Sequence, residues 1–231
     1  MATIKEIVYD IKNLIRGGQQ SDDEIISDRQ IEFQINSLRA QFIRQDLNKR
    51  RSISDNIKQV IHCLDVEPVS GSTCGLPADL KIMRSKHQIP NPIETSHSDL
   101  ITSIGPTGIL ATNFQMIPYN RAAWIGTNKY TKLMTFAFLL DNFIYITGPD
   151  SKYLEKIKAE GVFQNPREIS NFVDSKGNLS YDPDNHDYPL STSMLDLIKS
   201  SMLAQNMKPF IETLTDNSNN SKSDFQSNTQ K

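Results

Sequence analysis

Two amphipathic stretches separated by a pair of glycines open the chain and restrict its first part to a helical hairpin. Within residues 4–15 the apolar side chains recur at the three- and four-residue spacing of one helix face. Gly17 or Gly18 then supplies the left-handed residue that commonly ends a helix. The spacing therefore predicts one helix that stops at the glycines and a second element that must turn back on it.

The second helix is predicted by capping signals and by a regular apolar seam. Ser27 precedes Gln30 by three residues, and Ser21 precedes Glu24 by three, which is the spacing of a capping box. Negative charge gathers before the helix, where its dipole favours it, at Asp22, Asp23, Glu24 and Asp28. The apolar seam steps by four, three and four residues through Ile31, Ile35, Leu38 and Phe42. The helix ends in a basic cluster formed by Arg44, Lys49, Arg50 and Arg51.

The middle of the chain, residues 61–149, has the composition of strands. It is rich in β-branched and aromatic residues and is interrupted by glycine and proline turns. Two apolar runs flank Asp141-Asn142, a pair suited to a two-residue hairpin turn. Both runs are apolar at nearly every position, which indicates strands covered on both faces. We expect a small antiparallel sandwich or barrel.

Helical signals return after residue 150. We expect a helix over 150–161 that ends at Gly161, and a short helical turn capped by Asn165 with Pro166 in its first position. A last helix has one apolar face formed by Met194, Leu195, Ile198, Met202 and Leu203. The segment 215–231 is rich in asparagine and serine and is expected to be disordered in isolation.

These elements predict an α+β fold. Its parts are a helical hairpin over 1–60, a central antiparallel β sandwich or barrel over 61–149, a helical return over 150–214 that completes the bundle, and the tail over 215–231.

Composition excludes several classes of function. The chain has 231 residues with 25 lysines and arginines against 27 acidic residues, so a dedicated nucleic-acid binder is not expected. Apolar runs are too short for a membrane span, and the start of the chain lacks the pattern of a signal peptide. We expect a protein made in a cytoplasm and without a membrane partner.

A search for catalytic or metal-binding patterns returns no site. Cys63, Cys74, His62 and His87 could supply zinc ligands, but their spacing matches no zinc motif, and two reduced cysteines are the favoured interpretation. The acidic run 182–187 could hold calcium, yet it lacks the glycine and distal glutamate of an EF-hand loop, so a solvated loop is favoured. We therefore predict no catalytic, cofactor-binding or metal-binding residues, and no cofactor.

Two stretches are candidates for protein interfaces. The basic run from Arg44 to Arg51 is interpreted as a helix end facing water, with a phosphate- or partner-facing patch as the alternative. Arg121 and Trp124 have the chemistry of an interface anchor, although a core position for Trp124 is favoured.

The N-terminal segment resembles the opening of virion structural proteins of crAss-like and related Bacteroides tailed phages. The matching pieces are residues 4–18, the loop 21–23, and the stretch 29–32 leading to Arg39, Arg44 and Asp46. Residues 152–172 and 187–203 resemble later helices of the same group, so the resemblance covers about half the chain. It includes no catalytic residue.

This resemblance implies a head–tail connector protein of the virion, a ring-forming adaptor beneath the portal of a short-tailed phage. The implied partners are further copies of the chain in a twelve-fold ring, the portal, the lower tail rings and, non-specifically, the passing DNA. A cyclic ring requires two different complementary faces on each subunit. We expect Asp22, Asp23 and Glu24 to form one face, and Arg44, Arg50 and Arg51 the other.

Three alternatives remain at this point. The first alternative is another ring of the virion, the second is a tail hub or cargo component, and the third is a hydrolase that uses Cys74 or a histidine. The tail 215–231 either orders against a neighbouring virion protein or is a dispensable solvated segment.

Overall fold

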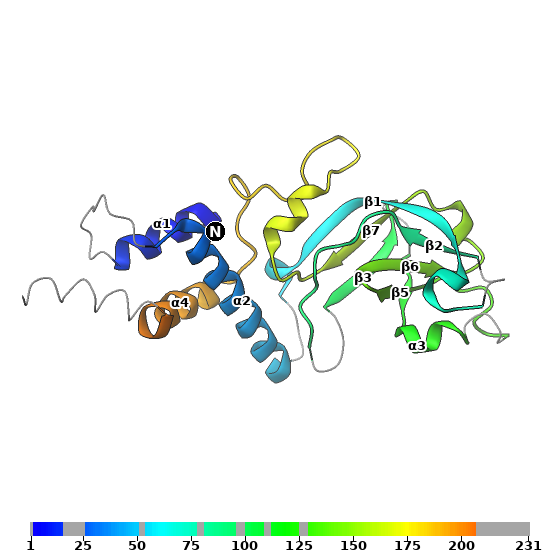
Figure 1. Ribbon diagram of the computed structural model, residues 1–231, viewed down its shortest axis with the longest axis horizontal. Helices are drawn as coiled ribbons and strands as arrows, with labels where there is room; N and C mark the ends of the chain where they lie inside the picture. Colours follow the sequence, from blue (N-terminus) through cyan, green and yellow to red (C-terminus); the bar gives the residue numbers. More distant parts are fainter. Residues whose placement is uncertain are drawn as a thin grey trace, which may run out of the picture.

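The computed structural model describes residues 2–15, 26–50, 54–77, 81–95, 100–108, 112–124 and 129–206. Figure 1 shows helices gathered at one end of an elongated molecule and a β barrel at the other. The helical end contains α1 (Ile4–Ile15), α2 (Asp28–Arg50), α4 (Thr192–Ser201) and the π-helical extension η5 (Met202–Asn206). Both the beginning and the end of the described chain therefore contribute to one helical module.

Both N-terminal helices begin at side-chain caps. Ser27 Oγ accepts a hydrogen bond from Gln30 N at 3.3 Å, which confirms the predicted cap of α2. A second cap was not predicted: Thr3 Oγ1 accepts from Glu6 N at 3.3 Å, and Glu6 Oε2 accepts from Thr3 N at 2.9 Å. The predicted stop at Gly17 or Gly18 and the Ser21–Glu24 box lie outside the described residues.

The helical module buries the predicted apolar faces. Ile31 and Ile35 of α2 have no exposed surface, Leu38 is buried, and Phe42 is half-buried. The same core takes Met194 and Ile198 of α4 and Met202 of η5, all of which are buried. The buried faces of α1, α2 and α4 thus meet in one core, while the connection between α1 and α2 lies outside the described residues.

Seven strands form a nearly closed barrel. They are β1 (Gln59–Ser70), β2 (Lys81–Ser85), β3 (Ile101–Pro106), β4 (Gln115–Met116), β5 (Phe136–Leu140), β6 (Phe143–Thr147) and β7 (Lys156–Gly161). Their order is β3-β7-β1-β2-β6-β5-β4, with every pair antiparallel except β4 and β5. Phe114 N donates to Ile104 O at 2.7 Å and so joins the two edges of the sheet. The α+β class is confirmed, and the β region is a barrel.

The hairpin between β5 and β6 has the predicted two-residue turn. Asp141 and Asn142 have φ angles of 51° and 62°, so both are left-handed, as in a type I′ turn. Asparagine and aspartate tolerate this region better than other residues with a Cβ.

The prediction of a helix over 150–161 is wrong. Residues 151–153 form the short 3₁₀ turn η3 (Ser151–Tyr153), and residues 156–161 form strand β7 between β1 and β3. Ile157, Ala159 and Gly161 are buried, whereas Lys156, Lys158 and Glu160 are not, which is the period of two expected for a strand. The backbone hydrogen bonds that β7 makes with β1 on one side and β3 on the other outweigh the helical preference of this short stretch.

The remaining short elements connect these parts. They are η1 (Asp55–Ile57), η2 (Gly71–Cys74), α3 (Tyr119–Ala122) and η4 (Pro166–Asn171). Asn165 caps η4 through its side chain, which accepts from Arg167 N at 3.2 Å, as predicted. Among the described helices none has the length and apolar character needed to cross a membrane.

Candidate assembly interface

A buried arginine fixes the helical module to the barrel. Arg39 of α2 has no exposed surface, and its guanidinium donates to Pro189 O at 2.9 Å and to Phe163 O at 2.7 Å. A longer contact of 3.5 Å reaches Ile57 O, and the guanidinium lies 5.7 Å from the centre of the Tyr188 ring. Burial lowers the pKa of Arg39, yet arginine remains protonated at neutral pH because its ordinary value is so high. One cation thus joins α2 to three distant segments.

Sequence reasoning did not identify this junction. Arginine is almost never fully buried unless it is paired, so its presence on a helix normally indicates an exposed position. The available signal was spacing: Arg39 lies four residues after Ile35 and one after Leu38, on the buried side of α2.

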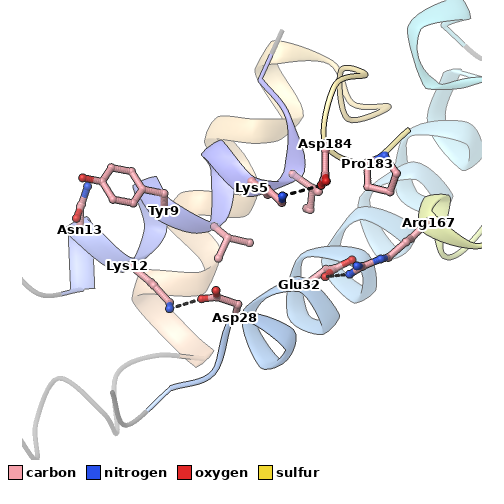
Figure 2. Close-up of a pocket in the computed structure, with 11 residues that line it drawn as sticks. Lys5, Tyr9, Lys12, Asn13, Asp28, Glu32, Arg167, Pro183 and Asp184 are labelled. Atoms are coloured by element: carbon pink, nitrogen blue, oxygen red, sulfur yellow. Dashed lines mark hydrogen bonds and ion pairs between the residues drawn. The ribbon is translucent and has the colours of Figure 1, made fainter. Parts of the chain in front are cut away.

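A groove of about 580 Å³ lies on the helical module between α1, α2 and the loop at Pro183 and Asp184. Figure 2 shows Lys5, Lys12 and Tyr9 of α1 beside it, with Asp28 and Glu32 on the facing helix. The apolar wall of the groove contains Ile4, Val8 and Tyr9, and Tyr9 is 66% exposed. We call this feature the helical groove.

Three ion pairs surround the helical groove (Figure 2). Lys5 Nζ lies 2.9 Å from Asp184 Oδ1, Arg167 Nη1 lies 3.0 Å from Glu32 Oε2, and Lys12 pairs with Asp28. Lys12 is only 12% exposed whereas Asp28 is 71% exposed, so this pair presents its carboxylate to solvent. Exposed ion pairs contribute little to folding, so their importance here is the charge pattern they give to the rim.

The barrel end carries a second surface with different chemistry. Trp124, Tyr130 and Leu133 are 77%, 82% and 82% exposed, and Met134 is 51% exposed. We call these four side chains the barrel-end surface. All four belong to the stretch of chain between α3 and β5, of which residues 125–128 lie outside the described residues. Large exposed apolar side chains are typical of protein contact sites, because water contact with them is unfavourable.

The barrel holds the Trp124 end of this connection through α3, and the other end of the connection runs into β5. Tyr119 Oη donates to Cys74 O at 2.5 Å, and its ring lies 6.0 Å from that of buried Phe138. Ala122 is almost completely buried against the same cluster. Figure 1 shows α3 at the part of the barrel far from α1. The helical groove and the barrel-end surface therefore belong to opposite ends of the molecule.

The predicted interface residues fall in different places. Trp124 is exposed, so the favoured core interpretation was wrong, and Arg121 beside it is also exposed. Arg44 is exposed, and its Nε donates to Glu94 O at 3.0 Å within the same chain. The other residues of the predicted acidic and basic faces lie outside the described residues: Asp22, Asp23, Glu24, Arg51 and the side chain of Arg50. These two faces therefore stay a prediction.

The geometry around the cysteines gives no support to a nucleophile. Cys74 is buried, its Sγ donates to Gly71 O at 3.3 Å, and burial raises the pKa of its thiol, which disfavours the thiolate. His62 and His87 are both exposed. Within the described part of the chain no three histidine, cysteine or acidic side chains gather as a metal site would require.

The acidic run 182–187 is organised by its own hydrogen bonds. Asp182 Oδ1 accepts from Asp184 N at 3.0 Å, and Asp182 Oδ2 accepts from Asn185 Nδ2 at 2.6 Å. These hydrogen bonds lower the pKa of Asp182, and the bond from the Asn185 side chain has the largest effect. The carboxylate therefore serves to shape the loop.

The helical module and the barrel carry contrasting surfaces at opposite ends of the molecule, an arrangement suited to contacts with other chains. Comparison with family models gives the particular class. Residues 6–225 match the model of phage tail ring protein 2, and the chain belongs to this family. It is thus a structural ring protein of a phage tail. No curated protein matches the chain.

Proposed function

We propose that the chain is the adaptor ring of the head–tail connector, docked beneath the portal and above the lower tail rings. The observation that carries this proposal is the match to a tail ring family along residues 6–225. In this proposal the subunit catalyses no reaction and works by assembly. The expected ring has twelve copies, which would follow the symmetry of the portal.

The two surfaces support the ring-forming part of this proposal. A closed ring is built from heterologous contacts, in which each subunit offers two different complementary patches. The helical groove and the barrel-end surface differ in shape and chemistry and belong to opposite ends of the molecule. A chain with this arrangement can meet one neighbour on each side.

The proposed lumen allows DNA to pass without binding it tightly. The chain has a net charge of −2, whereas proteins that hold DNA neutralise several phosphates with clustered cations. We expect the purified chain to give little retardation of duplex DNA at physiological salt in a mobility-shift assay. Strong, salt-sensitive binding would contradict a passive lumen.

Mass photometry of the chain, alone and mixed with the portal protein of the same genome, tests the position of the ring. Twelve copies of a 26.2 kDa chain would add about 314 kDa to the portal. A species of that added mass, absent when the portal is replaced by the major capsid protein, is the expected result. Binding to another tail ring protein and not to the portal would place the ring lower in the tail.

A further inference from the structure

We propose that the barrel-end surface of one subunit packs into the helical groove of the next copy of this chain in the ring. This inference rests on the proposed function only in requiring that the subunits form a ring, and it does not depend on portal binding. The barrel-end surface consists of Trp124, Tyr130, Leu133 and Met134. The helical groove lies between α1, α2 and the loop at residues 183–184.

Shape and polarity agree between the two surfaces. The helical groove has an apolar wall formed by Ile4, Val8 and Tyr9, and its volume of about 580 Å³ can accept large side chains. Tyr130 and Leu133 are each 82% exposed, so little of either side chain is used by its own fold. Protein interfaces commonly consist of an aromatic or aliphatic anchor placed in such a pocket and surrounded by a polar rim.

Charge also agrees between them. From residue 100 to residue 140 the chain contains three cations, Arg121, Lys129 and Lys132, and no acidic residue. All three cations are exposed and lie within three residues, along the chain, of one of the four side chains of the barrel-end surface. Asp150 is the one acidic residue that lines the pocket beside Leu133 and Met134. Across the contact the rim of the helical groove offers the carboxylates of Asp28 and Asp184, which are 71% and 56% exposed although each already has a lysine partner. An exposed carboxylate can accept a second cation, because its two oxygens have several lone pairs.

Placement on the molecule selects a second copy and not a self-contact. The barrel holds α3 and the surface that follows it at the end away from α1, and Arg39 fixes the two ends relative to each other. One chain therefore cannot bring its own barrel-end surface to its own helical groove. Repetition of the contact from one chain to the next is heterologous, which is the kind of contact that generates rings.

Cysteine cross-linking between two variant chains tests this pairing. In a Cys63→Ser, Cys74→Ala background, one chain carries Tyr9→Cys beside the groove and the other carries Leu133→Cys. Assembled rings, reconstituted or in virions, are treated with a short bismaleimide. Mixed rings are expected to give a covalent dimer, whereas rings of either variant alone give none, and a chain with both substitutions gives a ladder of multimers.

Leu197→Cys is the matched control. Leu197 is an exposed leucine of α4, 52% accessible, and belongs to neither surface. It is expected to give no dimer when mixed with Leu133→Cys. Equal cross-linking in this control, self-linking of Leu133→Cys, or no dimer in rings of verified mass would overturn the proposal. A ring that cross-links as expected but ignores the portal would overturn only the proposed position.

A second variant separates assembly from folding and from DNA binding. Leu133→Asp is expected to keep the circular dichroism spectrum and melting temperature of the parent, since the side chain is exposed, and to lower ring yield about tenfold or more, as for an interface hot spot. Unchanged ring yield would overturn the proposal. The proposal would also be overturned if the parent chain retarded DNA and the substitutions Trp124→Ser and Tyr130→Ser abolished this retardation. The barrel-end surface would then be a nucleic-acid site.

Discussion

Replacing Arg39 by methionine is expected to weaken the junction between the helical module and the barrel and so to lower the free energy of unfolding. Methionine has a similar unbranched stem but no donor, so Pro189 O and Phe163 O lose the hydrogen bonds of 2.9 and 2.7 Å. Each buried carbonyl left without a donor costs about 1–3 kcal/mol. The contact of 3.5 Å to Ile57 O is too long to add much.

The cost of burying the guanidinium offsets part of this loss. A buried cation carries a desolvation penalty of several kcal/mol, which methionine removes. We therefore expect Arg39→Met to lower the free energy of unfolding by about 2–4 kcal/mol. Arg39→Lys is expected to be at least as damaging. Lysine keeps the buried charge, but its ammonium lacks the planar fork that reaches carbonyls of two segments.

Urea unfolding followed by far-ultraviolet circular dichroism measures these changes. Tryptophan fluorescence is a poor reporter because Trp124, the single tryptophan, is 77% exposed. Arg44→Met is the matched control, since Arg44 is on the same helix but exposed, and water can replace its bond to Glu94 O. A loss of at most about 1 kcal/mol is expected. A loss of the same small size for Arg39→Met, or a milder effect of lysine than of methionine, would refute the reasoning.

Three further predictions concern the tyrosines at the junction and the hairpin turn. Tyr188→Phe removes a 2.6 Å hydrogen bond to Asn36 Oδ1 and is expected to lower the free energy of unfolding by about 1–2 kcal/mol. Tyr181→Phe is expected to leave it unchanged, because the Tyr181 hydroxyl has no partner among the described residues. Equal losses for the two variants in urea unfolding would contradict this. Burial raises the pKa of Tyr181 to about 12, above its ordinary value of 10.0, so the folded state binds the proton more tightly. The resulting stability is complete below pH 10 and is lost as the pH rises toward 12; unfolding midpoints should fall across this range and fall less in Tyr181→Phe. Asn142→Ala replaces asparagine, which tolerates a φ of 62°, by a residue that adopts this angle less readily, and is expected to cost about 1–2 kcal/mol in thermal unfolding. Asn142→Gly is expected to be milder, because glycine adopts this angle freely and both variants lose the same bond from Asn142 Nδ2 to Asn91 Oδ1. The reverse order would show that backbone conformation does not govern the turn.

The parts of the fold that follow local chemistry could be predicted from the sequence. The seam of α2, the cap at Ser27 and the left-handed pair Asp141-Asn142 are encoded within a few residues of each other, and all are present. Strand β7 could not be identified in this way. Its pattern is compatible with helix, and the deciding hydrogen bonds come from β1 and β3, which are distant in sequence.

The candidate site was predictable only in part. Arg121 and Trp124 were identified as a possible anchor from residue type, but exposure depends on what the barrel leaves uncovered, which pattern does not reveal. The helical groove was not predicted, because it forms where α1, α2 and the loop at Asp184 meet. Buried Arg39 was missed for the related reason that its partners are carbonyl groups, which every residue has.

The order in which the helices occur along the chain has a consequence for when the subunit becomes able to assemble. α1 and α2 are synthesised first, but their core is completed by Tyr188, Leu190 and α4, and one acceptor of Arg39 is Pro189. During translation the barrel segment can pair its strands while the first two helices still lack their last partners. The groove on α1 and α2 is therefore completed only after residues 183–201 have been synthesised, which delays contact between neighbouring nascent chains until the whole barrel has been made.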